Sequence, residues 1–131
     1  MMDLNSLFLS VMEQDRAPVV ICDLQHTVVY MNPAAKERYA YAGGGDLLGK
    51  SLLGCHSPAT SKKIERILAL FRESRENNIY YEDRNNEENK DVYTVALRDE
   101  SGELIGYYEK HEYRDPETAK FYDYDNPIAI V

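Results

Sequence analysis

Residues 28–35 read VVYMNPAA, and this stretch decides how the rest of the chain is organised. Its apolar first half predicts a β-strand. Asn32 and Pro33 then end the strand, because asparagine is a preferred N-cap and proline is favoured in the first turn of a helix. The stretch therefore predicts a strand followed directly by a short helix from Pro33 to about Tyr39.

The residues before this strand predict its partner. Residues 17–24 (APVVICDL) form a second apolar run, and Gln25-His26 offers a turn, so we expect a β-hairpin. Still earlier, residues 3–14 place four apolar side chains at helical spacing: Leu4, Leu7, Phe8 and Val11. Because so short an amphipathic helix is marginal alone, we expect it to cover the domain's own sheet or a second protomer.

The residues after the short helix predict a glycine-rich loop, a helical turn at 46–53 and then the clearest helix of the chain. Ser57-Pro58 begins this helix, and Asn77-Asn78 ends it. Its apolar stripe consists of Ile64, Ile67, Leu68 and Phe71. Three strands are predicted to follow, at residues 79–83, 91–98 and 103–113.

The second of these three strands is apolar on both faces. Tyr93, Val95 and Leu97 share one face, and Val92, Thr94 and Ala96 share the other. Such a strand fits a sheet that is covered on both sides. We expect helices and a pocket on one side, and the N-terminal helix or a partner on the other.

These elements predict an α+β fold: a five-stranded antiparallel sheet whose strands split two and three around a helical insert. The 131 residues suffice for one core. We expect an N-terminal amphipathic helix over residues 1–15, the domain over residues 16–114 and an acidic, aromatic tail over residues 115–131.

This order of elements resembles the PAS (Per-Arnt-Sim) fold, and local stretches strengthen the resemblance. Residues 28–35 resemble the family's second strand and its Asn-x-Ala helix start. Residues 46–52 (DLLGKSL) resemble its acidic-x-Leu/Ile-Gly-Lys element, and residues 98–106 (RDESGELIG) resemble its final hairpin. Residues 55–58 (CHSP) resemble the Cys-His-x-Pro element of a bacterial subgroup. The resemblance implies a bacterial sensor module for signal transduction, and not an enzyme.

The composition of the chain argues against several classes of binding partner. The formal net charge of −8 argues against binding to nucleic acid or to anionic membranes. No stretch approaches the roughly 20 apolar residues of a transmembrane helix, and two cysteines are too few for a secreted disulfide scaffold. We therefore expect a cytoplasmic protein. Since no output domain follows in the sequence, we expect signalling through a homodimer or another signalling protein.

Candidate ligand-binding residues lie on elements that line the central cavity in PAS domains: Tyr30, Asn32, Tyr39, Tyr41, Tyr93 and Tyr107. As a group they would suit a small polar aromatic or acidic ligand, held by hydroxyls in an apolar pocket. The alternative is that the rings fill the core, which would leave a ligand-free dimerisation module. The sequence leaves both interpretations open.

Cys55 and His56 are the remaining candidates, because the positive end of a helix lowers a thiol pKa and disfavours a protonated imidazole. They could form a redox-active thiol and a haem-ligating histidine, or an inert buried cysteine and a helix-entry histidine. The family's haem branch uses a histidine on the long helix itself, which His56 precedes. Its flavin branch uses an Asn-Cys-Arg motif, which is absent and argues against flavin.

Metal and catalytic sites find little support in the sequence. Adjacent Cys55 and His56 point different ways, which argues against a zinc site shared with Cys22 and His26. No nucleophile-base-orienter set is visible. We expect His26 and His111 at the surface.

Overall fold

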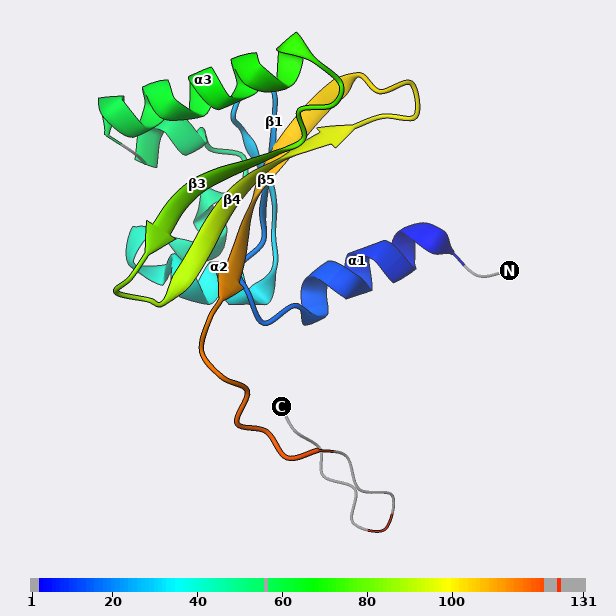
Figure 1. Ribbon diagram of the computed structural model, residues 1–131, viewed down its shortest axis with the longest axis vertical. Coiled ribbons are helices and arrows are strands. Elements are labelled where there is room, and N and C mark those ends of the chain that lie inside the picture. The colour runs from blue at the N-terminus through cyan, green and yellow to red at the C-terminus, as the bar shows by residue number, and fades with distance from the viewer. Residues whose placement is uncertain (1–2, 56, 122–124, 126–131) are drawn as a thin grey trace.

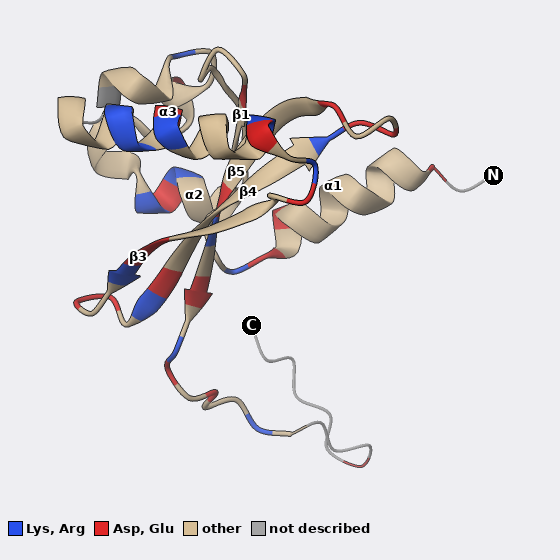
Figure 2. Cartoon of the chain, turned by 45° about the horizontal axis from the view of Figure 1, so that its top comes forward, with Lys and Arg blue, Asp and Glu red and all other residues tan. Residues whose placement is uncertain are grey.

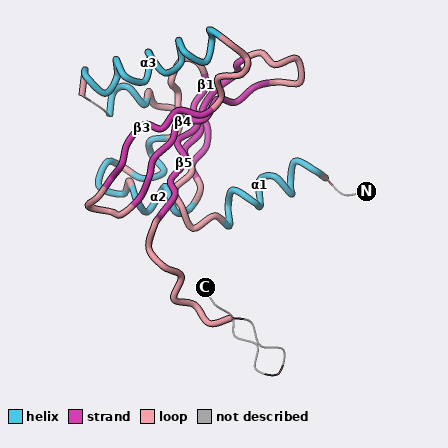
Figure 3. Tube along the Cα trace, viewed as in Figure 1, coloured by secondary structure: helices cyan, strands magenta, loops and turns pink. Residues whose placement is uncertain are grey.

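The computed structural model describes residues 3–55, 57–121 and 125. Five strands form one antiparallel sheet in the order β2-β1-β5-β4-β3 (Figures 1 and 3). The strands are β1 (Val20–Asp23), β2 (Val28–Met31), β3 (Ile79–Asn85), β4 (Lys90–Arg98) and β5 (Leu104–Tyr113). Because β1 pairs with β5, the first hairpin and the last three strands close into a single sheet, as predicted.

The helical insert lies between β2 and β3. It contains α2 (Pro33–Arg38), α3 (Pro58–Glu73) and three 3-10 turns, η1 (Ala40–Ala42), η2 (Gly44–Leu47) and η3 (Leu52–Cys55). Both α-helices start as predicted: the side chain of Asn32 accepts from the Ala35 amide, and that of Ser57 accepts from the Thr60 amide. The single predicted turn at 46–53 is wrong, because two separate 3-10 turns occupy the region.

The core lies between α3 and one face of the sheet. The predicted stripe of α3 is confirmed, since its four side chains are all buried: Ile64, Ile67, Leu68 and Phe71. They pack in one cluster with side chains from the first hairpin and β5: Val20, Cys22, Val28, Met31 and Tyr107. This cluster fixes which face of the sheet is the inner one.

Strand register sorts the sheet residues into two rows that cross all five strands. On the inner face the row reads Tyr80, Thr94, Glu109, Val20 and Met31. On the outer face the neighbouring row reads Ile79, Val95, Tyr108, Ile21 and Tyr30. The inner row thus places a threonine and a glutamate beside the core, whereas the outer row is apolar and aromatic. The five residues of the outer row are called the outer apolar row below.

The predicted N-terminal helix is present as α1 (Leu4–Gln14), and it projects away from the sheet (Figure 1). Its apolar stripe is exposed, with fractional exposures of 58% for Leu4, 44% for Leu7, 56% for Phe8 and 71% for Val11. Glu13 is its one charged residue, so the helix stays almost free of charge in Figure 2. The helix therefore does not cover its own sheet.

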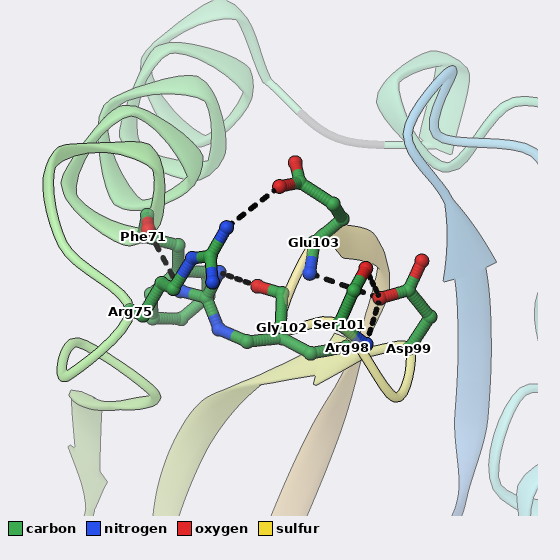
Figure 4. A network of polar contacts seen from close by, with 7 residues as sticks. All are labelled: Phe71, Arg75, Arg98, Asp99, Ser101, Gly102 and Glu103. Atoms are coloured by element: carbon green, nitrogen blue, oxygen red, sulfur yellow. Dashed lines mark hydrogen bonds and ion pairs between the residues drawn. The ribbon is translucent and has the colours of Figure 1, made fainter.

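Arg98 ties the end of α3 to the last hairpin (Figure 4). Its guanidinium donates to the carbonyl of Phe71 at 2.7 Å, to that of Gly102 at 3.1 Å and to Oδ1 of Asn78 at 2.6 Å. The carboxylate of Asp99 accepts from the amides of Ser101 and Glu103 and so shapes the turn. The long helix consequently ends at Glu73, earlier than predicted.

No helix in the described part of the chain is long and apolar enough to cross a membrane.

Candidate functional site

The site begins with a polar row on the inner face of the sheet. Register sets Thr94 of β4 opposite Glu109 of β5. The hydroxyl of Thr94 donates a hydrogen bond of 2.8 Å to Oε2 of Glu82, which lies at a bulge in β3. Three neighbouring strands thus bring two carboxyl groups and one hydroxyl together beneath the helical insert.

These three side chains border a cavity of about 120 Å³ between the sheet and the insert. Its apolar lining includes Val20, Val28, Met31, Leu47, Leu52 and Ile64. Tyr39 is half-buried at the cavity, and Tyr107 is buried there. Tyr41 is 80% exposed and stands at the mouth of the cavity. The cavity therefore joins an apolar, aromatic interior to one acidic wall.

The acidic wall favours the protonated form of one of its carboxyl groups. Glu82 and Glu109 border the cavity together. Burial, and then the neighbouring carboxylate of Glu82, raise the pKa of Glu109 far above the ordinary value for glutamate. Desolvation and the adjacent carboxylate thus favour the protonated form of Glu109 near neutral pH.

Further charges surround this pair. Lys90 is only 1% exposed, and its Nζ lies 3.0 Å from Oε2 of Glu88. The guanidinium of Arg38 in α2 lies 3.0 Å from the same oxygen. The interaction with Lys90 lowers the pKa of Glu88, which keeps that carboxylate ionised. The carboxylate of Glu88 therefore forms ion pairs with both Lys90 and Arg38. All three groups lie near the acidic wall.

His111 also belongs to this inner layer, so its predicted surface position is wrong. It is 8% exposed, and burial lowers the pKa of its imidazole to about 4. Its Nε2 lies 4.0 Å from Oε2 of Glu109. Because β-sheet side chains alternate, residues 107, 109 and 111 of β5 all face inward.

Tyr107 and Cys22 lie together in the core cluster, where Tyr107 also contacts His26. The hydroxyl of Tyr107 lies 2.7 Å from Nδ1 of His26, so this histidine is tied to the site rather than free at the surface as predicted. Burial raises the pKa of the Cys22 thiol to about 11, and burial also raises that of Tyr107. A thiol with so high a pKa is a poor nucleophile at neutral pH.

The structure brings only some of the predicted site residues to the cavity. Tyr39, Tyr41 and Tyr107 line it. Tyr93 faces the other side of the sheet, where its ring stacks on that of Tyr81 at a centroid distance of 5.2 Å. Tyr30 also lies on the outer face, and its hydroxyl donates to Glu13 of α1 at 2.6 Å. The expectation that these two tyrosines face the cavity is therefore wrong.

Asn32 is fully buried, but it serves the backbone instead of the cavity. Its Oδ1 accepts hydrogen bonds of 2.9 Å from the amides of Val19 and Ala35. Its side-chain amide donates to the carbonyls of Met12, Asp15 and Ala17. Cys55 and His56 remain predictions, because His56 and the side chain of Cys55 lie outside the described residues.

Sequence reasoning missed the residues of the acidic wall and its surroundings: Glu82, Glu109, Thr94, Lys90 and His111. The available signal was the alternation of β4, which puts Thr94 on the face opposite Tyr93. Within the part of the chain that the structure describes, no group of three His, Cys, Asp or Glu side chains is placed to hold a metal ion.

A haem or a flavin does not fit this cavity. An apolar cavity of about 150 Å³ accommodates one benzene molecule, and the volume here is about 120 Å³. A haem macrocycle and the three fused rings of a flavin are each several times larger than benzene. The acidic wall would in addition oppose the propionates of haem or the phosphate of a flavin nucleotide.

Comparison with known proteins agrees with this architecture. A family model described as a PAS domain matches residues 16–109. The PAS domain of BvgS from Bordetella pertussis superimposes with a TM-score of 0.60 at 20% identity, covering 88% of this chain and 89% of that chain. A PAS domain from Colwellia psychrerythraea gives a TM-score of 0.62 at 14% identity, covering 85% and 97%.

A sensory box sensor histidine kinase from Vibrio cholerae is similar as well, with a TM-score of 0.54 at 18% identity and coverage of 83% of this chain and 90% of that chain. At such identities these similarities establish the fold alone. No curated protein matches the chain.

Proposed function

The chain belongs to the PAS domain family of sensory and signalling modules, and from this premise we propose that it binds a small molecule in its inner cavity and signals through association with a second copy. The observation that carries the proposal is the combination of an apolar cavity and three converging polar groups. Binding sites for small molecules typically have this composition: mostly apolar walls with a few placed polar groups. The alternative remains a ligand-free dimerisation module.

The junction of β2 and α2 offers a route from the cavity to α1. Met31 lines the cavity, and the next residue is Asn32. Asn32 in turn binds the carbonyls of Met12 and Asp15 at the end of α1. A ligand that displaces Met31 would therefore alter the attachment of α1, provided that it binds the two arrangements with different affinity.

A second copy is the partner that best fits the exposed surfaces. The apolar stripe of α1 is exposed, for example at Val11 (71% exposed), and the outer apolar row is half-buried apart from Ile79, which is 68% exposed. An amphipathic helix with a single charged residue gains most by packing on an apolar surface. Two copies could bury both surfaces at once, with α1 of one copy on the outer apolar row of the other.

A fragment screen by two-dimensional ¹H–¹⁵N NMR tests the proposal. We expect fragments of about benzene size to shift the amide signals of Thr94 and Glu109, and in the same titration those of α1. Val28→Phe should fill the cavity and abolish these shifts, since Val28 is 4% exposed and lines the cavity. Val29→Phe is the matched control, because Val29 is 54% exposed.

If no fragment binds the parent protein, while native mass spectrometry still gives a dimer without added mass, the ligand-free dimerisation module replaces the sensor. Shifts that persist in Val28→Phe would place the ligand outside the cavity.

A further inference from the structure

We propose that the cavity selects a small organic monocation, such as a protonated primary amine on a compact apolar body, and that Glu82 and Glu109 bind its ammonium group. This inference rests on the proposed function and specifies the ligand class of the same site. It differs from the sequence-based expectation of a polar aromatic or acidic ligand, because that expectation did not include the acidic wall.

The two carboxyl groups have a fixed geometry that suits an ammonium group. Glu109 lies on a central strand and is flanked in register by Thr94 and Val20. Glu82 is oriented by the 2.8 Å hydrogen bond from Thr94. An ammonium group offers three donors, and the paired carboxyl groups offer acceptors from two strands at one wall of the cavity.

The charges that face this wall sum to one negative charge when every carboxylate is ionised. The negative groups are Glu82 of β3, Glu109 of β5 and Glu88 of the β3–β4 turn, and the positive groups are Arg38 of α2 and Lys90 of β4. His111 stays neutral, because burial lowers its pKa to about 4. Lys50 lines the mouth but is exposed, so its charge is solvated. One proton or one bound monocation therefore neutralises the site.

Other ligand classes fit less well. An anion would enter a site whose net charge is at best zero, next to two carboxyl groups, at a considerable electrostatic cost. A divalent metal would need a third ligand, and the described residues contain no such group of three. Tyr39, Tyr41 and Tyr107 also line the cavity, and an aromatic ring attracts a cation that lies over its face.

The apolar lining and the size of the cavity define the rest of the ligand. Apolar side chains such as Val28, Leu52 and Ile64 face the body of any occupant. At about 120 Å³, somewhat less than the roughly 150 Å³ of a cavity that binds benzene, the cavity has room for a short alkyl chain or at most a single ring. The geometry thus points to an amine of this size rather than to a polyamine or a larger base.

Binding of such a cation should release a proton. Burial and the neighbouring carboxylate of Glu82 raise the pKa of Glu109, which favours its protonated form near neutral pH. An ammonium group beside the two carboxyl groups at the wall of the cavity would stabilise the ionised form of Glu109 and take over the role of that proton. Affinity should therefore increase with pH until Glu109 is ionised in the free protein.

Isothermal titration calorimetry with matched probes tests the inference. The probes are benzylamine, benzyl alcohol and benzoate, together with butylamine, butanol and butyrate. We expect the amines to bind about tenfold or more tightly than the alcohols, as one charge-assisted hydrogen bond would give, and the acids not to bind. Titrations near pH 6.5 in buffers of different ionisation enthalpy should give a release of about one proton per amine bound.

Glu109→Gln is the decisive variant, because it keeps the shape and the hydrogen bonding of the side chain while removing the charge. It should weaken amine binding about tenfold or more, change alcohol binding by less than about threefold, and abolish the release of a proton. Glu82→Gln should act in the same way. Glu103→Gln is the control, since Glu103 lies in an exposed turn, where it pairs with Arg75. Thermal unfolding of each variant establishes that it is folded.

Failure of the inference is distinct from failure of the proposed function. If the alcohols or acids bind as tightly as the amines, cation selectivity is overturned, while a small-molecule cavity stands. If amines bind but Glu109→Gln and Glu82→Gln leave their affinity unchanged, the ammonium site lies elsewhere and the inference falls. If none of the six probes binds, the inference also falls, and only an empty fragment screen would remove the proposed function as well.

Discussion

The side-chain amide of Asn32 donates a hydrogen bond of 3.0 Å to the carbonyl oxygen of Met12, in the last turn of α1. Asn32 also caps α2 through the amide of Ala35 and is itself fully buried. A single side chain thus connects the N-terminal helix with the wall of the cavity.

Replacement of this asparagine should separate its two roles. Asn32→Ala leaves several buried backbone groups without partners, so we expect a loss of about 3 kcal/mol in the free energy of unfolding, measured by urea denaturation. Asn32→Asp keeps the oxygen that caps α2 but turns a carboxylate oxygen toward the carbonyl of Met12. Hydrogen exchange of α1 should then accelerate while that of α3 does not change.

Asn86→Ala is the control for this pair, because Asn86 is exposed in the β3–β4 turn. It should cost less than about 0.5 kcal/mol. Equal exchange rates of α1 in Asn32→Asp and in the parent protein would mean that this hydrogen bond does not hold the helix.

Gly106 permits the close approach of β5 to β1. A Cβ atom at this position would lie 2.5 Å from the carbonyl oxygen of Cys22, so the two strands would have to move apart. We expect Gly106→Ala to lower the free energy of unfolding by about 2 kcal/mol or more, as is typical of overpacking. Gly54→Ala should be nearly neutral, because nothing lies within 4 Å of its Cβ position. Similar denaturation midpoints for both variants would contradict this explanation.

Arg98 should contribute more to stability than an exposed arginine nearby (Figure 4). Arg98→Met removes the donors for Phe71 and Gly102, and we expect a loss of about 2 kcal/mol. Arg98→Lys should recover only part of the lost stability, because an ammonium group cannot reproduce the planar fork of donors of a guanidinium. Arg75→Met should cost less than about 1 kcal/mol, since its ion pair with Glu103 is exposed to solvent. The reverse order in urea denaturation would refute this assignment.

The sequence predicted the strands and the buried stripe of α3 because those signals are local. Alternation along β4 also established which residues share a face. It could not tell which face the helices cover, since both are apolar, and the bulkier side chain of Tyr93 was wrongly expected in the cavity. In the structure Thr94 lies on the inner face, where its hydroxyl donates a hydrogen bond to Glu82.

The acidic wall was not predictable in the same way. Lys90 and Glu109 belong to residue types that are mostly exposed, and histidine is intermediate, so the inward position of Lys90, Glu109 and His111 has no local signature. They become neighbours only because β4 pairs with β5 in a particular register. Such a relationship depends on contacts between distant parts of the chain, which periodicity does not contain.

His111 should make the protein sensitive to mild acid. Its pKa is about 4 in the folded protein, below the ordinary 6.5 expected after unfolding. A lowered histidine pKa leaves stability intact above about pH 6.5 and removes it as the pH falls through 4, by up to about 3 kcal/mol. Glu109 acts in the opposite sense, since its raised pKa removes stability as the pH rises from the ordinary value for glutamate through the raised one.

The contribution of His111 is the difference in the free energy of unfolding between the parent protein and a variant without the imidazole, measured as a function of pH. His111→Gln should flatten the fall in the free energy of unfolding between about pH 6.5 and 4, measured by urea denaturation at several pH values. Curves for the two proteins that run parallel through this range would exclude a neutral, buried imidazole.

The exposed stripe of α1 should determine the oligomeric state. Leu4→Asp combined with Phe8→Asp places two charges on side chains that are 58% and 56% exposed in one copy, and burial of such charges in an interface is costly. We expect this double variant to be monomeric in sedimentation velocity experiments at concentrations where the parent protein is a dimer. Asn5→Asp with Ser10→Asp adds the same charge outside the stripe and should leave the dimer intact. A dimer that survives the first pair of changes would show that α1 is not its interface, and the outer apolar row would then have to associate without it.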